Sequence, residues 1–214
     1  FDNLGNNNLG LGATPSKVAT DYAEKTLLSF FGRVNYSLLD RYLFTGTLRM
    51  DGSSVFSAKH KWGFFPSFSA AWRVNEEPFL KDVEFISNLK LRAGWGSVGN
   101  DRIASNLSLA LYQSSKYGIG TSTTTVLTPK QLPNEDLRWE GSTASNIGVD
   151  FGLFGSRLNL TVDLFVKNTK DLLLEKSLAN VTGFSSQYQN IGKIKNKGLE
   201  ISLNSVNIET KNFT

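Results

Sequence analysis

The segment Tyr42–Asp51 (YLFTGTLRMD) alternates residue by residue between two chemistries, and this alternation restricts what the chain can form. Tyr42 and Phe44 fall on one parity together with other apolar residues, whereas Thr47 and Arg49 fall on the other. Successive side chains of a β-strand point to opposite faces. The segment is therefore predicted to be a strand with one apolar and one largely polar surface.

The same alternation recurs along the chain, which predicts an all-β fold of about seven antiparallel, up-and-down strands. Tight hairpins are expected at Leu39-Asp40 and after Phe151. Residues 1–23 are predicted to be a loop, and the polar spans 98–140 and 168–197 to be long connections without a clear period. The other predicted strands cover residues 28–38, 64–74, 89–97, a segment ending at 151, 158–167 and 199–204.

Charge and connection length both indicate an outer-membrane barrel. Every charged residue within the predicted strands lies on the polar parity, as a lipid-facing apolar surface requires, since Lys or Arg at the bilayer midplane costs ~2–4 kcal/mol. Short and long connections tend to alternate, with residues 75–87 as a partial exception. The apolar parity carries aromatic residues near the short turns, where an interfacial girdle is expected: Tyr36, Tyr42, Trp72 and Phe151. A soluble, secreted β-sandwich that binds glycans would alternate in the same way and stays open as the alternative.

Composition narrows the remaining classes. The 214 residues begin at Phe1, so we expect a piece of a longer protein, and they include no cysteine, which excludes a disulfide framework. The net charge of +4 is spread along the chain, so no nucleic-acid partner is expected. No apolar run approaches the ~20 residues of a membrane helix.

Three short motifs contain residue types that could carry chemistry. Gly94–Gly99 (GWGSVG) matches G-x-G-x-x-G, but the preceding strand carries charges on one face, unlike a buried Rossmann strand. His60 is the single histidine and has no nucleophile signature beside it. Glu76 and Glu77 are interpreted as two solvated carboxylates of a turn beside a proline. No enzyme activity, metal site or cofactor is therefore expected.

Aromatic residues in the predicted connections are the candidates for contacting substrate, because such rings can stack on sugar rings or peptide side chains. Packing within the loops or at a barrel rim is the alternative role for the same residues. The candidates are Trp62, Tyr112, Tyr117 and Trp139.

Seven stretches, in order along residues 41–204, resemble the SusC/RagA family of TonB-dependent outer-membrane transporters. They are RYLFTGTLRMDGSS (41–54), KWGFFPSFSAAWRVNEEPFL (61–80), ISNLKLRAGWGSVGN (86–100), LPNEDLRWE (132–140), NIGVDFGLF (146–154), RLNLTVDLFVKNTKDLLL (157–174) and GFSSQYQNIGKIKNKGLEISLN (183–204).

This resemblance implies that residues 1–214 are a segment of a large barrel in a Gram-negative outer membrane, without the plug domain and the remaining strands. It implies energised import of oligosaccharides or peptides, a SusD-like surface lipoprotein as partner, and coupling to the TonB complex through the plug. Outer-membrane lipid would contact the apolar parity. The polar parity would face the lumen, with these candidates for selectivity or plug contact: Arg33, Arg49, Arg73, Arg92, Asp150, Asp163 and Glu200.

Overall fold

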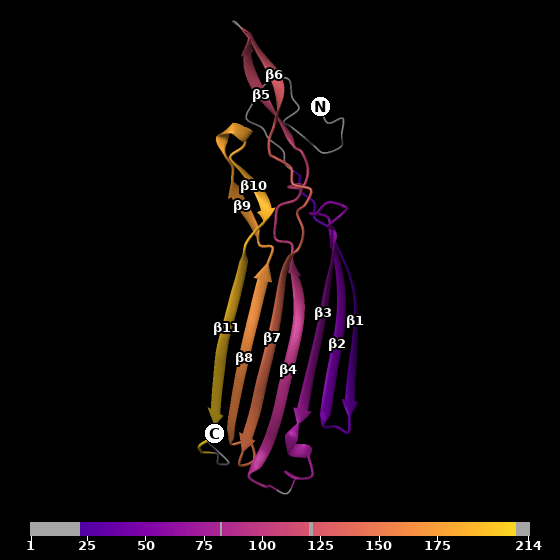
Figure 1. Ribbon diagram of the computed structural model, residues 1–214, viewed down its shortest axis with the longest axis vertical. Helices are drawn as coiled ribbons and strands as arrows, with labels where there is room; N and C mark the ends of the chain where they lie inside the picture. The colour runs from indigo at the N-terminus through magenta and orange to yellow at the C-terminus, as the bar shows by residue number, and fades with distance from the viewer. Residues whose placement is uncertain (1–21, 82, 120–121, 209–214) are drawn as a thin grey trace.

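The computed structural model describes residues 22–81, 83–119 and 122–208, so most of the predicted N-terminal loop lies outside the described residues. Seven long strands form one antiparallel sheet in the order β1-β2-β3-β4-β7-β8-β11 (Figure 1). They are β1 (Leu27–Leu38), β2 (Tyr42–Ser53), β3 (Trp62–Arg73), β4 (Ile86–Asn100), β7 (Glu140–Leu153), β8 (Leu158–Lys170) and β11 (Lys193–Ser205).

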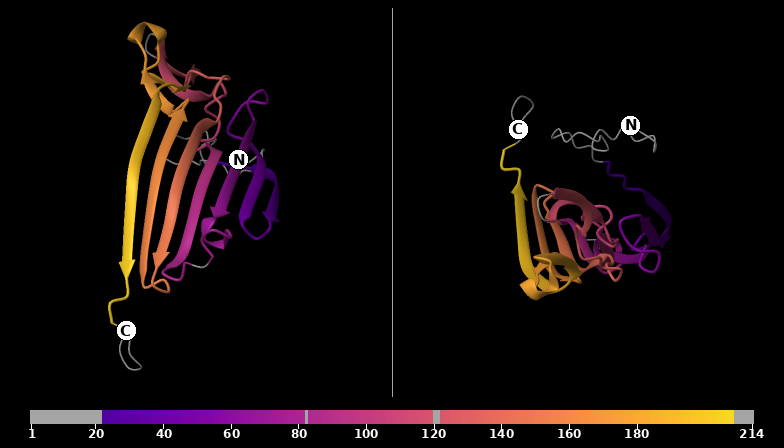
Figure 2. Two further views of the ribbon diagram at one scale, coloured as in Figure 1. Left: turned by 60° about the horizontal axis from the view of Figure 1, so that its bottom comes forward. Right: turned by 90° about the horizontal axis from the view of Figure 1, so that it is seen from above.

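The sheet confirms the predicted all-β, up-and-down arrangement of seven strands. A β-sandwich would require a second sheet packed face to face on the first. The described strands instead form this single large sheet and two separate two-stranded pairs. Seen from above, the large sheet is curved, like a section of barrel wall (Figure 2).

The two additional pairs lie in the spans that were predicted to be long connections, so that prediction is wrong for these residues. One hairpin is formed by β5 (Tyr112–Ile119) and β6 (Ser122–Pro129), and the other by β9 (Leu173–Ser177) and β10 (Ser186–Asn190). Figure 1 shows both hairpins beyond the same end of the long strands. β5, β6 and β9 are mostly exposed on both faces, and β10 is half-buried along its whole length, so the alternation that reveals a strand with one buried face is missing.

The connections differ strongly between the two ends of the sheet. At one end residues 39–41 join β1 to β2, and Leu39 and Asp40 both have positive φ, as the central residues of a type I′ turn do. The same end carries the short link 154–157 and the longer link 74–85, which includes the 3₁₀ helix η2 (Val74–Glu76). The opposite end carries residues 54–61, 101–139 and 171–192, including η3 (Asn180–Thr182). We call these the short-turn end and the long-loop end.

Cross-strand register gives the sheet two chemically distinct faces. On the apolar face, Tyr36 lies opposite Phe44, which in turn lies opposite Ala70. Aromatic rings stack along this face, as in the pair Tyr42–Trp72, whose centroids are 6.2 Å apart. The charged face is formed by the alternate residues, which include most of the basic and acidic side chains of the strands.

The sheet buries little of its own apolar surface. Phe64 on β3 and Ile201 on β11 are 61% and 64% exposed, and both lie on the apolar face. The buried cluster among the described residues lies instead at the long-loop end, where Val55, Phe56 and Leu137 pack together. A continuous exposed apolar face of this extent must be covered by a membrane or a partner. No helix among the described residues is long and apolar enough to cross a membrane.

Candidate functional site on the charged face and loops

The predicted lumen residues share one face of the sheet. The register places Arg33 opposite Thr47, Ala71 opposite Arg92, and Arg73 opposite Lys90, so the charged residues of neighbouring strands stay in phase. Asp150, Asp163 and Glu200 continue the same face across β7, β8 and β11. Strand pairing thus confirms the shared face, while its role in a lumen stays a prediction.

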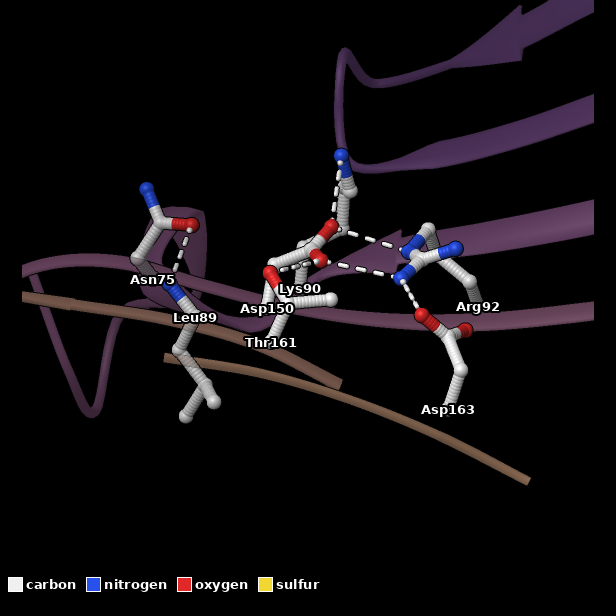
Figure 3. Close-up of polar contacts among 7 residues, drawn as sticks. All are labelled: Asn75, Leu89, Lys90, Arg92, Asp150, Thr161 and Asp163. Atoms are coloured by element: carbon white, nitrogen blue, oxygen red, sulfur yellow. Dashed lines mark hydrogen bonds and ion pairs between the residues drawn. The ribbon is translucent and has the colours of Figure 1, made fainter. Parts of the chain in front are cut away.

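Arg92 is the centre of a network that crosses three strands (Figure 3). Its Nε and Nη2 donate to the two carboxylate oxygens of Asp150 at 2.9 and 3.0 Å, and Nη2 also donates to Asp163 at 3.0 Å. Lys90 Nζ lies 3.0 Å from Asp150, and Thr161 donates to the same carboxylate at 3.3 Å. Two cations and two carboxylates neutralise each other, so the network is a structural cross-brace rather than a free charge.

Gly148 makes this brace possible. Arg92 on β4 and Asp163 on β8 both lie opposite Gly148 on the strand between them. A Cβ at Gly148 would collide with Asp163 Oδ1 and lie 2.8 Å from Arg92 Nη2. The missing side chain therefore leaves the space through which the guanidinium reaches across β7.

The other charged-face candidates have separate partners. Arg49 pairs with Asp51 at 2.7 Å and also donates to Ser29. Arg33 Nε donates to Thr47 Oγ1 at 3.1 Å, and Arg73 donates to the Asp40 carbonyl at 3.4 Å. Glu200 lies opposite Asp163 in the register. The face therefore carries the neutral Arg92 network, the Arg49–Asp51 ion pair and several individual charges.

The four aromatic candidates occupy three different environments. Trp62 lies on the apolar face, where its ring is stacked on Phe30 with centroids 6.1 Å apart. Trp139 packs against Phe56 and Phe65 at the long-loop end and donates to the Lys61 carbonyl. These positions favour an interfacial role for Trp62 and a packing role for Trp139.

Tyr112 and Tyr117 are both well exposed and lie on opposite faces of the β5–β6 hairpin, because they are an odd number of residues apart on one strand. Contact with substrate stays a prediction for all four aromatic residues.

A further opening lies near this hairpin and was not predicted. It is a polar cleft of about 400 Å³ between the two loop hairpins, lined by residues that include Gln113, Lys130, Glu175, Gln187 and Tyr188.

Glu77 is the residue whose role the sequence interpretation missed. It is only 7% exposed, so the prediction of a solvated turn carboxylate is wrong. Tyr42 OH and Trp72 Nε1 donate to its Oε1 at 2.7 and 3.0 Å, and Arg41 Nη1 donates to its Oε2 at 3.1 Å. The hydrogen bond from Tyr42, followed by that from Trp72 and the charge of Arg41, lowers the pKa of Glu77.

The loop segment LPNEDLRWE (132–140) connects several parts of the long-loop end through buried and hydrogen-bonded residues. Leu137 is completely buried against Val55 and Phe56. Asn134 donates to the Tyr188 carbonyl at 2.7 Å, and Gln187 donates to the Pro133 carbonyl at 2.7 Å. A lone leucine between charged residues has no periodic signal, so only the spatial arrangement reveals its burial.

The glycine motif and the histidine that could carry chemistry both lie in surroundings that explain them structurally. Gly94–Gly99 lies within β4 of the sheet, and a Cβ at Gly99 would collide with the Phe65 ring. His60 Nε2 lies 3.8 Å from the exposed carboxylate of Asp136. Among the described residues, no group of three or more His, Cys, Asp or Glu side chains is placed to hold a metal ion.

Comparison with solved structures extends the assignment of the fold. The RagAB peptide importer in its closed-closed state superposes with a TM-score of 0.82 and 30% identity, over 95% of this chain and 22% of that chain. The siderophore receptor PirA from Pseudomonas aeruginosa superposes with a TM-score of 0.57 at 19% identity, over 84% of this chain and 31% of that chain, and shows likeness of fold alone.

Sequence comparison identifies the family. A family model described as TonB dependent receptor-like, beta-barrel matches residues 1–214. TonB-dependent receptor SusC of Bacteroides thetaiotaomicron is 45% identical over 202 residues, which are 91% of this chain and 20% of that protein. TonB-dependent receptor P3 of Formosa agariphila is 41% identical over 207 residues, 97% of this chain and 21% of that protein. The chain spans about a fifth of these curated relatives. It therefore belongs to the TonB-dependent receptor β-barrel family, whose members are receptors and transporters rather than enzymes, and is of the SusC/RagA type.

Proposed function

We propose that this chain is a wall segment of an outer-membrane transporter that imports oligosaccharides or peptides with energy from the TonB complex. The family match over all 214 residues carries the proposal. The two faces of the sheet support it, because one is largely apolar and exposed while the other holds most of the charges of the strands. In a membrane barrel the first faces lipid and the second faces the lumen.

The class of cargo is proposed from the loops and from a relative. RagAB is described as a peptide importer, and the similarity to it covers 95% of the present chain. The cleft between the two loop hairpins is lined by amide, hydroxyl and charged side chains, which suit the hydrogen-bonding groups of peptides and sugars. We place substrate contact at this cleft and at the exposed Tyr112 and Tyr117.

The proposed partners follow the SusC/RagA type. A SusD-like lipoprotein would cover the long-loop end, and the TonB complex would act through a plug domain outside this segment. On the charged face, Arg33 and Glu200 are exposed and suited to contact a plug or cargo, whereas Arg92 is engaged by two carboxylates.

Uptake measurements test the proposed activity. Cells with and without the full-length gene would be given labelled oligosaccharide and peptide mixtures, and the comparison would be repeated in cells lacking TonB. We expect the cells to deplete one of the two mixtures, and to do so only when they carry both the full-length gene and the gene for TonB. Equal uptake in all three strains would refute the proposal.

The placement of the two faces has its own test. Single spin-labelled cysteines at alternate positions from Tyr42 to Met50 should contact a lipid-soluble quencher in bilayers, whereas those from Leu43 to Arg49 should not. The segment has no native cysteine, which removes competing label sites within it.

Charge reversal of Arg49 in the full-length protein then tests the lumen role, because unchanged uptake and plug retention would remove support for it.

A further inference from the structure

Four lysines break the rule that charge is confined to one face of the sheet. The strands are longer than the alternation predicted, and β11 begins at Lys193 rather than near Leu199. The added residues bring charge onto the apolar face, which contradicts the expectation that this face carries none. They are Lys170, Lys193, Lys195 and Lys197. We call them the lysine patch.

The register fixes the position of the patch. Lys197 lies opposite Val166, and Lys193 lies directly opposite Lys170. β8 ends and β11 begins here, at the long-loop end of the sheet (Figure 1). On the described parts of the seven strands, no other Asp, Glu, Lys or Arg lies on the apolar face. All charge on this face therefore has one sign and one location.

The depth of the patch matches the edge of a membrane. From Leu158 to Val166, β8 rises ~27 Å along its axis, which at a tilt of ~40° is a height of ~21 Å. The apolar band of an outer-membrane barrel is ~25 Å tall. Lys197 therefore lies near the top of the band, and Lys195 and Lys193 lie at head-group level.

The patch has no acidic partner in the part of the chain that the structure describes. All four lysines are exposed, and none takes part in the ion pairs found among the described residues. Like charges directly opposite each other on neighbouring strands destabilise a sheet, so the Lys170–Lys193 pair favours an anion between the two ammonium groups.

An apolar hollow adjoins the patch. It has a volume of about 560 Å³, and Ser145, Ile147, Leu164, Val166 and Lys197, which line it, share the apolar face. Ser145 is small compared with its neighbours Trp95 and Val166 in the same row. A hydrocarbon chain can lie in such a hollow while an attached anionic group meets the lysines above it.

We propose that the lysine patch and this hollow bind the phosphorylated head group and an acyl chain of an outer-leaflet lipid. Phosphate offers acceptor oxygens and negative charge to the ammonium groups. The inference rests on the proposed function, because it requires the long-loop end to face the outer leaflet. It adds a defined lipid site to that function.

The test uses the purified full-length protein and two probes, bisphosphorylated lipid A and the same lipid after enzymatic removal of its phosphates. Native mass spectrometry would measure how much of each lipid the protein retains. The test variant is Lys193→Gln/Lys195→Gln/Lys197→Gln. Its matched control is Lys59→Gln/Lys116→Gln/Lys176→Gln, which removes three exposed lysines from the long-loop end.

We expect the wild-type protein and the control variant to prefer the phosphorylated lipid at least tenfold, because each lysine near a charged head group contributes ~1 kcal/mol, or about fivefold. The test variant should lose most of that preference. Equal retention of the two lipids by the wild-type protein would overturn the inference even if the variant failed to fold. An undiminished preference in a folded test variant would do the same.

Two further measurements distinguish a lipid site from a site for soluble anions, and a failure of this inference from a failure of the proposed function. Competition by inorganic phosphate beyond that of chloride at equal ionic strength would indicate a soluble anion and would overturn the lipid assignment. Recovery in the outer-membrane fraction and heat-modifiable electrophoretic mobility report on the barrel itself. If the protein is recovered in the outer membrane and shows heat-modifiable mobility but does not prefer the phosphorylated lipid, only this inference is overturned. If it shows neither membrane recovery nor heat-modifiable mobility, the proposed function is overturned.

Discussion

At the scale of single residues, Glu77 shows how one carboxylate fastens the short-turn end. It receives hydrogen bonds from Tyr42 and Trp72, which stack on each other on the apolar face, and from Arg41. The two aromatic side chains thus present their rings to lipid and their polar atoms to a fixed acceptor, as interfacial tyrosine and tryptophan commonly do.

The pKa of Glu77 gives the first prediction. A lowered pKa in the folded state means that ionised Glu77 stabilises the fold at pH values above the ordinary glutamate pKa of ~4.3. That contribution is lost as the pH falls through the lower, folded-state pKa. Glu77→Gln in the full-length protein should lower the melting temperature at neutral pH, and the difference from wild type should shrink below about pH 4. Melting curves at several pH values measure this.

Glu76→Gln is the matched control, since Glu76 is adjacent and accepts only from its neighbour Asn75 among the described residues. Its melting temperature should follow the wild-type curve at all pH values. A constant difference between Glu77→Gln and wild type down to the most acidic pH would contradict the proposed role of the ionised carboxylate.

Gly148 provides the second prediction. Gly148→Ala should displace Arg92 or Asp163 and cost ~1–3 kcal/mol in unfolding free energy, since the brace is only partly exposed. Gly141→Ala on the same strand, where a Cβ meets nothing within 4 Å, should be neutral or slightly stabilising. Urea unfolding of the full-length protein in lipid measures both. Additivity of Gly148→Ala with Asp163→Asn would show that the cost does not arise from the ion pair.

At the scale of elements, alternation predicted the seven wall strands because each has one apolar and one polar face. It missed β5, β6, β9 and β10, because the first three are largely exposed, β10 is evenly half-buried, and none alternates between a buried and an exposed face. It also began β11 too late, because Lys193–Lys197 is polar on the parity that should be apolar. The charged-face residues were found by parity, but the partners of Arg92 follow from register and from Gly148, which no single segment encodes.

The loops give the third prediction, because Leu137 joins them. Leu137→Ala removes a completely buried side chain and should cost ~2–5 kcal/mol locally. Tryptic cleavage near Arg138 in the folded full-length protein should then accelerate at least about tenfold, if cleavage follows local opening. Leu127→Ala, at an exposed position on β6, should leave the rate unchanged. Similar rates for both variants would show that the cluster does not hold the loops together.

At the scale of the whole molecule, the sheet depends on surroundings that the described residues do not supply. Its apolar face is exposed, and β1 and β11 each have one unpaired edge within the described sheet. Unpaired backbone groups cannot be left in lipid, and closed membrane barrels have at least ~8 strands.

The fourth prediction follows from these edges. Residues 1–214 expressed alone should not insert into liposomes as a monomeric pore, whereas the full-length protein with its plug removed should conduct. Single-channel recording and solute-release assays compare the two. Stable conductance from the monomeric segment would show that it closes without further strands.

The order of strands in the sheet also bears on how the molecule is built. Among the described residues, each wall strand pairs with the wall strand that follows it in the chain, and the two extra hairpins each close on themselves. Apart from β4 and β7, which are joined across residues 101–139, each wall strand finds its partner within about twenty residues, so the search for correct neighbours stays short. The wall can grow one hairpin at a time, in the order in which the residues are delivered to the membrane.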